Sequence, residues 1–204
     1  MHLTPTQEEV VALLRETGAL RDGHFQNPSG LHSNEYLQVP LALRHYQYHR
    51  TLSVGLARLL RANPEIRAIT QELSIVTPMT GGLPVAFGVC EALRARRVYW
   101  AERDNLNEAL RFRQFLQPEP GEQVVIVDDI LRTGNKLSEL KNLLESYGAL
   151  VVGLAVIIYQ PVPNCATFGN LPLYYLAKLE PRYAVDSAHC EWCKSGVPLI
   201  KTWI

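Results

Sequence analysis

The alternation of apolar and polar segments over residues 46–160 predicts helices that alternate with buried strands. Helices are expected from Tyr46 to about Arg61, up to about Arg94, and from about Asn135 to Tyr147. The apolar runs between and after them are LSIVT, VYWA, VVIVDD and ALVVGLAVII. Continuous apolar strands between amphipathic helices are typical of a parallel sheet covered on both faces. The pattern therefore predicts an α/β fold with a central, mostly parallel sheet flanked by helices.

The N-terminal pattern predicts a helix followed by a small hood. Thr4 is expected to cap this helix, with Pro5 in its first turn, Gln7 at the capping-box position and Gly18 at its end. The next segment, DGHFQNPSGLHSNEYLQVP, contains Gly and Pro residues that exclude a long helix. We expect one domain, 1–204, with an N-terminal helix and hood (1–45), an α/β core (46–180) and a C-terminal tail (181–204).

Charge and composition exclude several classes of partner. The 204 residues contain 20 Lys and Arg against 20 Asp and Glu, so no net charge attracts nucleic acid or an anionic membrane. No apolar run is long enough to span a bilayer, and the N-terminal residues lack the pattern of a signal peptide. We expect a cytoplasmic protein with no nucleic-acid or membrane partner. The four cysteines are too few for a disulfide scaffold.

Two of the predicted strands end in segments suited to ligand binding, because ligands of such folds bind at the carboxyl ends of the strands. The first is TPMTGG, and the second is DDILRTGN, which contains Asp128 and Asp129. A polar turn before a helix offers backbone N–H groups and the helix dipole to a phosphate. Two adjacent carboxylates suit ribose hydroxyls or a divalent cation instead.

The apolar run, two acids, two apolar residues and Thr/Gly-rich turn together resemble the 5-phosphoribosyl 1-diphosphate (PRPP) motif of type I phosphoribosyltransferases. Within that family the chain is similar to orotate phosphoribosyltransferases. ALLRETGALRDGHFQNPSGLHSNEYLQ resembles their hood, and CEWCKSGVPLIK resembles the Cys-x-x-Cys-x-x-Gly-x-Pro tail of many bacterial members. The resemblance runs from about residue 10 to 201. It implies transfer of the phosphoribosyl group of PRPP to orotate or a related pyrimidine-like base, with release of pyrophosphate, in pyrimidine nucleotide synthesis.

The resemblance also implies roles for particular residues. Asp128 and Asp129 would hold the ribose hydroxyls of PRPP, and Mg²⁺ would arrive with the substrate, without a dedicated cluster of protein ligands. The 5′-phosphate would be wrapped by Arg132, Thr133, Gly134 and Asn135, and the diphosphate by Thr77, Thr80, Gly81 and Gly82. Phe25 and Gln160 would contact the base.

The polar stretch from Ala101 to Gln123 is similar to the family's mobile catalytic loop, which reaches into the active site of a neighbouring subunit. The resemblance therefore implies a homodimer with a loop shared across the interface. The cations of this loop are Arg103, Arg111 and Arg113, of which Arg103 and Arg111 join the acidic pair as catalytic candidates. In a closed site, such cations neutralise the pyrophosphate as it leaves.

Three departures from the family pattern bear on function. Arg132 replaces the first Thr of the usual turn, and the loop contains neither Lys nor His. Tyr159 and Gln160 stand where family members have Asp-Arg, whose arginine grips orotate. A non-catalytic or regulatory PRPP-binding protein and a phosphoribosyltransferase for a different base are therefore the alternatives. A nucleic-acid-binding regulator is disfavoured by the neutral charge and the absence of a basic stripe.

The Cys190 and Cys193 pair forms half of a zinc-binding pattern. His189 and His24 are the histidines that could complete it. We interpret the pair as packed thiols in a C-terminal turn, with a structural metal site and a redox motif as the alternatives.

Overall fold

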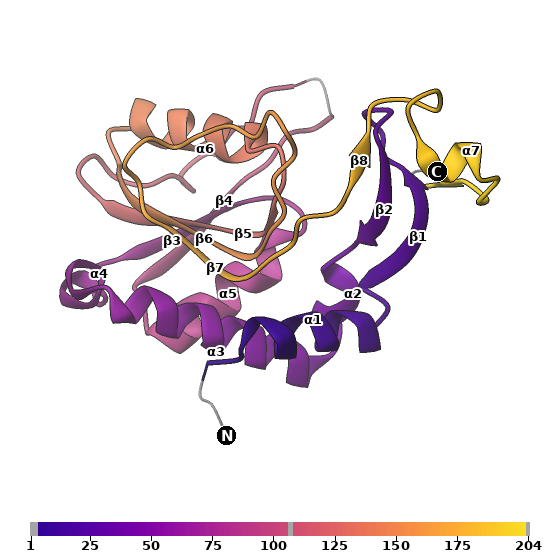
Figure 1. The fold of residues 1–204 in the computed structure, drawn as a ribbon. Helices are drawn as coiled ribbons and strands as arrows, with labels where there is room; N and C mark the ends of the chain where they lie inside the picture. Colours follow the sequence, from indigo (N-terminus) through magenta and orange to yellow (C-terminus); the bar gives the residue numbers. More distant parts are fainter. Residues whose placement is uncertain (1–3, 106–107, 203–204) are drawn as a thin grey trace.

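A five-stranded sheet forms the centre of the molecule in the computed structural model, which describes residues 4–105 and 108–202 (Figure 1). Its strands lie in the order β4-β3-β5-β6-β7, and every neighbouring pair is parallel. The strands are β3 (Ser74–Pro78), β4 (Arg97–Ala101), β5 (Gln123–Leu131), β6 (Leu150–Tyr159) and β7 (Leu173–Lys178). The predicted α/β class is confirmed, and this sheet is parallel throughout.

Helices cover both faces of this sheet. Figure 1 shows α1, α3 and α5 on one face and α6 on the other. The helices of the core are α1 (Gln7–Glu16), α3 (Tyr46–Ala62), α4 (Pro64–Ile69), α5 (Gly82–Leu93) and α6 (Asn135–Ser146). On β5, Val125 and Val127 pack toward one helical layer, while Val124 and Ile126 pack toward the other. Because both faces of the strand are buried, its sequence is a continuous apolar run.

Strand β5 runs further than the sequence pattern predicts. The pattern ends the buried strand at Val127, but β5 continues through the acidic pair to Leu131, which pairs with Tyr159 of β6. On its other side, β5 pairs with β3 only as far as Ile126. The acidic pair therefore lies on a strand that extends past its shorter neighbour, and the residues that follow β3 occupy the space beside it.

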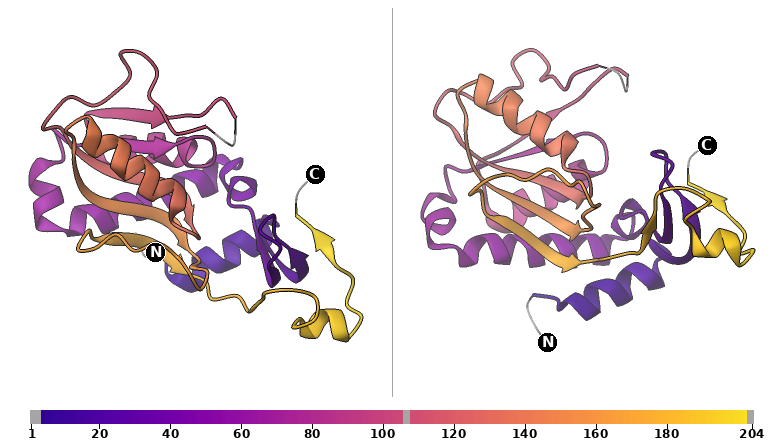
Figure 2. Two further views of the ribbon diagram at one scale, coloured as in Figure 1. Left: turned by 90° about the horizontal axis from the view of Figure 1, so that it is seen from above. Right: turned by 45° about the horizontal axis from the view of Figure 1, so that its top comes forward.

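A second sheet joins the two ends of the chain. In the described residues it has the order β8-β2-β1-β9, with β1 and β2 antiparallel and β9 parallel to β1. Its strands are β1 (Leu20–Gln26), β2 (His32–Leu37), β8 (Tyr183–Ala184) and β9 (Ile200–Lys201), accompanied by α2 (Pro40–Leu43) and α7 (Glu191–Lys194). Both views of Figure 2 show the C-terminal segment lying beside the N-terminal strands. We call this sheet, with α7, the hood.

Two local expectations need correction. The first helix is capped by Thr6 and not by Thr4: Thr6 Oγ1 accepts a hydrogen bond from the Glu9 N–H, and Glu9 Oε2 accepts one from the Thr6 N–H. Glu9 therefore takes the capping-box position that we assigned to Gln7. The expected end is confirmed, because Gly18, with a φ of +71°, follows the C-cap residue.

The stretch 101–123 carries more structure than a free loop. Glu102 and Arg111 pair through an isolated β-bridge. Leu110 and Phe112 are buried, and the Phe112 ring makes an edge-on contact with Tyr147. The described part of this loop is thus anchored on the same side of the sheet as α6. None of the helices within the described ranges is long and apolar enough to cross a membrane.

Candidate active site

The turn between β3 and α5 packs directly against the acidic pair of β5. A Cβ atom added at Gly82 would lie 2.2 Å from Thr77 Oγ1 and 2.5 Å from Asp128 Oδ1. A Cβ at Gly81 would lie 2.6 Å from Asp129 Oδ2. No side chain fits at either position, which explains the Gly-Gly sequence. The structure therefore brings together five of the predicted site residues from two separate motifs.

The acidic pair is buried. Asp128 is inaccessible to solvent and Asp129 is 7% exposed. Burial raises the pKa of both carboxyl groups above their ordinary values, and the charge of Asp129 raises the pKa of Asp128 further. The Lys136 ammonium, 3.2 Å from Asp128 Oδ2, lowers the pKa of both. Asp128 Oδ2 nevertheless accepts no hydrogen bond within the described residues. A buried acceptor without a hydrogen bond is costly to stability and is typical of a ligand site.

The turn before α6 offers backbone donors next to this pair. Gly134, at the N-cap of α6, has a φ of +78°, and a Cβ there would lie 2.8 Å from the Cβ of Ala166. Glycine therefore satisfies both the left-handed conformation and the close approach. Thr133 and Asn135 on either side of it are exposed. The N–H groups and dipole of a twelve-residue helix make this turn a suitable phosphate site.

A cavity of about 700 Å³ connects the two turns with the loop that follows β4. Its polar lining includes Thr80, Arg103, Arg113, Thr133, Asn135 and Lys136. Lys136 is a site residue that the sequence analysis did not single out. Its position in the first turn of a helix that follows a Thr-Gly turn was the available signal, since a cation there meets both the acidic pair and a bound phosphate.

The three loop arginines are paired with acids of the same chain. Arg103 forms an ion pair with Glu139 on α6, whose other carboxylate oxygen accepts a hydrogen bond from the Leu110 N–H. Arg111 pairs with Asp104, and Arg113 pairs with Glu102. Arg103 and Arg113 line the cavity, whereas Arg111 is not among its lining residues.

Arg132 and Gln160, which are distant in sequence, are in contact. Arg132 Nε donates a hydrogen bond of 3.0 Å to Gln160 Oε1, and Gln160 is 2% exposed. Burial lowers the pKa of the Arg132 guanidinium, and Tyr183, Asp129 and Tyr36 act in the opposite direction. A guanidinium group thus lies beside position 160, although the residue at that position is a glutamine.

Phe25 lies in the hood and not among the residues that line the cavity. It is buried, and its ring centroid lies 5.5 Å from that of Tyr36. Tyr36 in turn acts on the Arg132 guanidinium. Phe25 is therefore linked to the Arg132 end of the site through Tyr36.

A buried acid pair between two donor-rich turns, at the carboxyl edge of a parallel sheet, is an arrangement suited to a phosphorylated ribose, because ligands of such folds bind at this edge. The comparisons with known proteins agree. A family model described as the phosphoribosyl transferase domain matches residues 51–164, more than half of the chain. The chain belongs to this phosphoribosyltransferase family, in its orotate phosphoribosyltransferase branch.

Relatives and solved structures resemble the chain over most of its length. It is 32% identical over 197 residues to the orotate phosphoribosyltransferase of Pelotomaculum thermopropionicum, covering 96% of each chain. It is 34% identical over 190 residues to that of Thermotoga maritima, covering 93% of this chain and 94% of the relative. The crystal structure of orotate phosphoribosyltransferase from Aeropyrum pernix superposes with a TM-score of 0.65 at 20% identity, covering 83% of this chain and 93% of that one. This superposition shows that the fold is shared.

Proposed function

We propose that this protein transfers the 5-phosphoribosyl group of PRPP to orotate, with release of pyrophosphate, as a step of pyrimidine nucleotide synthesis (EC 2.4.2.10). One observation carries the proposal: the turn between β3 and α5 packs on the buried acidic pair with no room for a side chain at Gly81 or Gly82. Two motifs 46 or more residues apart thereby form one site, next to the N-terminus of α6.

Each part of the site takes one part of PRPP. Asp128 and Asp129 accept hydrogen bonds from the ribose hydroxyls, which supply the hydrogen bond that Asp128 Oδ2 lacks among the described residues. The turn 132–135 donates backbone N–H groups to the 5′-phosphate. The turn that contains Thr77 to Gly82 does the same for the diphosphate, because its glycines allow the backbone to come close.

Breaking the bond between C1 of ribose and the diphosphate leaves positive charge on the ring and negative charge on the leaving group. Arg103 and Lys136, which line the cavity, neutralise the leaving diphosphate. The negative charge of Asp128 and Asp129 stabilises the positive ring. Arg103 must first leave Glu139, and we infer that the loop moves when substrate binds, closing the site against water.

Mg²⁺ fits this site as a partner of the substrate. It supplies positive charge to the diphosphate when it is bound. Asp128 and Asp129 offer the carboxylate oxygens that Mg²⁺ prefers, and Asp128 Oδ2 is buried without a hydrogen bond in the described residues. These two side chains would hold it, directly or through its water molecules.

The base-binding end is assigned to Arg132 and Gln160. The Arg132 guanidinium pairs with the carboxylate of orotate, and the Gln160 amide, which is buried beside it, hydrogen-bonds the pyrimidine edge. This arrangement provides the positive charge for orotate without an arginine at position 160.

The test is an assay of purified protein with PRPP, Mg²⁺ and orotate that follows the loss of orotate absorbance. We expect turnover, and we expect Asp129→Ala to abolish it while the exposed Asp22→Ala keeps it. Isothermal titration with PRPP separates the alternatives. If PRPP binds but orotate is not consumed, the orotate assignment is wrong, and a screen of other bases then distinguishes a different transferase from a regulatory PRPP-binding protein.

We further propose that the enzyme works in the cytoplasm as a homodimer in which the loop after β4 is shared. The support is an exposed aromatic surface: Tyr46 on α3 is 73% exposed, and Phe87 on α5 is 52% exposed and lies 6.2 Å from Trp100 between ring centroids. Light scattering after size exclusion is expected to give twice the mass of the chain, and Phe87→Glu is expected to give the monomer. A monomeric wild-type protein would contradict the proposal.

A further inference from the structure

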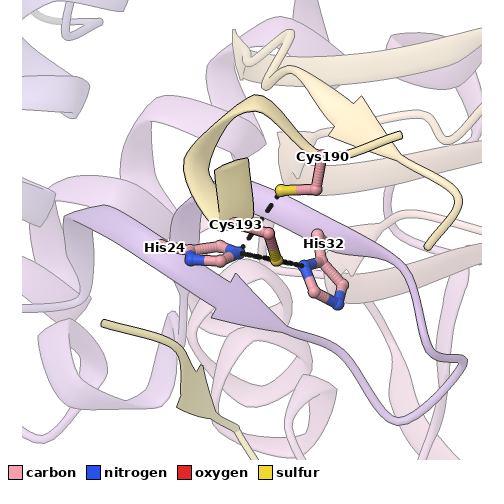
Figure 3. A group of neighbouring side chains, drawn as sticks. All are labelled: His24, His32, Cys190 and Cys193. Atoms are coloured by element: carbon pink, nitrogen blue, oxygen red, sulfur yellow. Dashed lines mark hydrogen bonds between the residues drawn. The ribbon is translucent and has the colours of Figure 1, made fainter. Parts of the chain in front are cut away.

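The hood contains two histidines and two cysteines that point toward one another (Figure 3). They are His24 on β1, His32 on β2, and Cys190 and Cys193 at the start of α7. One donor atom from each residue lies within 4.8 Å of the others. We call these four residues the His/Cys cluster. Nothing in the proposed transfer reaction uses it.

Four donor-atom distances within the cluster are close to those of a metal centre. His24 Nε2 lies 3.4 Å from Cys190 Sγ, 3.6 Å from Cys193 Sγ and 2.9 Å from His32 Nδ1. Cys193 Sγ lies 3.4 Å from His32 Nδ1. Tetrahedral zinc with two nitrogen and two sulfur ligands sets its donor atoms about 3.3–3.8 Å apart. The sulfur–nitrogen distances fit directly, and the imidazoles need to separate by about 0.4 Å.

A contact outside the cluster orients its first histidine. His24 Nδ1 lies 2.9 Å from the carbonyl oxygen of Val197. Because a carbonyl oxygen can only accept, Nδ1 carries the proton and the lone pair of Nε2 faces the cysteines. A hydrogen bond of this kind from the distal nitrogen is the usual support of a metal-binding imidazole.

Burial and charge also favour a metal. Cys190 is inaccessible, and His24 and His32 are 1% and 2% exposed. Two thiolates and two neutral imidazoles balance the charge of one Zn²⁺, so the filled site has no net charge to bury. Four protein ligands leave no open position, which is typical of structural zinc and not of catalytic zinc.

We propose that His24, His32, Cys190 and Cys193 bind one structural Zn²⁺ that fixes α7 to strands β1 and β2 of the hood. The C-terminal segment has little apolar contact to hold it: α7 contains no buried residue, and Val197, Leu199 and Ile200 are exposed. Its ligands join segments up to 169 residues apart. A metal bound there stabilises the hood, as an apolar core stabilises a larger domain.

The cluster corrects one expectation of the sequence analysis. His189, one of the two histidines considered for the cysteine pair, is exposed and bonds Asp186 at 2.8 Å, and His32 takes its place. The cysteines, which the sequence analysis interpreted as packed thiols, each lie within hydrogen-bonding distance of an imidazole nitrogen.

The test is metal analysis of the full-length protein, purified under reducing conditions from zinc-supplemented medium. We expect one zinc per chain by mass spectrometry. After chelation and addition of Co²⁺, we expect the visible absorption of tetrahedral cobalt with thiolate ligands. Cys193→Ser is expected to weaken metal binding at least tenfold, whereas Cys165→Ser, which removes a thiol outside the cluster, keeps the wild-type affinity. These measurements use no substrate, so they do not depend on the proposed transfer reaction.

A second measurement on wild-type protein covers the case in which Cys193→Ser does not fold. Zinc is expected to protect Cys190 and Cys193 from alkylation in the native protein, and chelation is expected to expose them and lower the melting temperature. Substoichiometric zinc without a cobalt spectrum, or equal alkylation before and after chelation, would overturn the proposal. So would a disulfide between the two cysteines in the protein purified under reducing conditions.

Discussion

Each of the two sheets of this protein is stabilised by a different kind of interaction. The large sheet buries apolar side chains on both faces, as Val124 and Val125 on β5 illustrate. The hood has short strands, and α7 contacts β1 and β2 through a cluster of two buried histidines and two cysteines. Apolar burial is non-directional and tolerant, whereas a polar cluster is stable only when every donor has its partner. Each region is therefore sensitive to a different kind of substitution.

The same contrast divides the candidate site. The PRPP end is formed by turns of the large sheet, where close backbone packing positions the acidic pair. The base end depends on Arg132, whose guanidinium interacts electrostatically with the hood residues Tyr36 and Tyr183. A change in the core is therefore expected to affect catalysis, and a change in the hood is expected to affect base binding.

The largest effect is expected from Gly82→Ala. The new methyl group would overlap Thr77 Oγ1 and Asp128 Oδ1, so the turn must move away from the acidic pair. We expect a loss of about 1–3 kcal/mol in unfolding free energy and a fall in kcat/KM of about 100-fold or more. Denaturant melts and steady-state kinetics measure both.

The control for this change is Gly153→Ala on β6, where the added Cβ would lie 3.4 Å from the nearest atom, an ordinary contact. Near-wild-type activity of Gly82→Ala would show that the packing of the turn does not position the acids. Metal binding in the hood should be unchanged in both variants, because the two regions are held independently.

Arg132→Gln tests the base end. If the guanidinium pairs with the orotate carboxylate, the KM for orotate should rise about 10- to 100-fold, and more than the KM for PRPP. Arg67→Gln, on the exposed part of α4, is the control for loss of one positive charge. A larger rise in the KM for PRPP would instead assign Arg132 to the 5′-phosphate.

Asp128→Asn tests the electrostatic strain of the acidic pair. A carboxyl group whose pKa is raised in the folded state stabilises the protein at pH values below its ordinary pKa of about 4. This contribution is lost as the pH rises through the raised pKa. The free wild-type protein should therefore become less stable than Asp128→Asn as the pH rises from about 4 to neutrality, by about 1 kcal/mol or more. Melting temperatures measured across this range check it.

The variant is also expected to lose most of its turnover, so stability and activity should move in opposite directions. A stability difference that does not change with pH would contradict the raised pKa of the pair. Asp22→Asn, at an exposed position of the hood, is expected to leave both the melting temperature and the turnover near wild type.

The smallest effect is expected from Glu139→Gln, which weakens the ion pair that holds Arg103. Partly exposed pairs contribute about 0.5–1 kcal/mol. We therefore expect kcat/KM to rise about two- to fivefold, because the ion pair that holds Arg103 on α6 is weakened. Glu145→Gln, which removes the partner of Lys141 on the same helix, is the control. A fall in kcat/KM would indicate that Glu139 supports the active loop conformation.

Local pattern predicted much of the core. The apolar strands β3 to β6 and the helices α3, α5 and α6 were predicted within a few residues, because each element carries its own periodicity. The short helix α4 and the edge strand β7 were not predicted. The two donor-rich turns and the acidic pair were also found, since short motifs keep their chemistry in one stretch of chain. Thr6 was missed as the helix cap because Thr4 and Thr6 are chemically equivalent candidates, and the capping hydrogen bonds decide between them.

From the sequence alone follow most of the helices and strands of the core, the positions of the glycine turns, and two adjacent carboxylates at the end of a strand. The other features depend on tertiary structure. It placed Arg132 against Gln160, extended β5 past β3, and brought His32 to cysteines more than 150 residues away. These contacts depend on how whole sheets and chain ends are arranged in space. The spacing of residues along the chain does not predict that arrangement. Packing sets the distances between such residues, and their separation in the sequence does not.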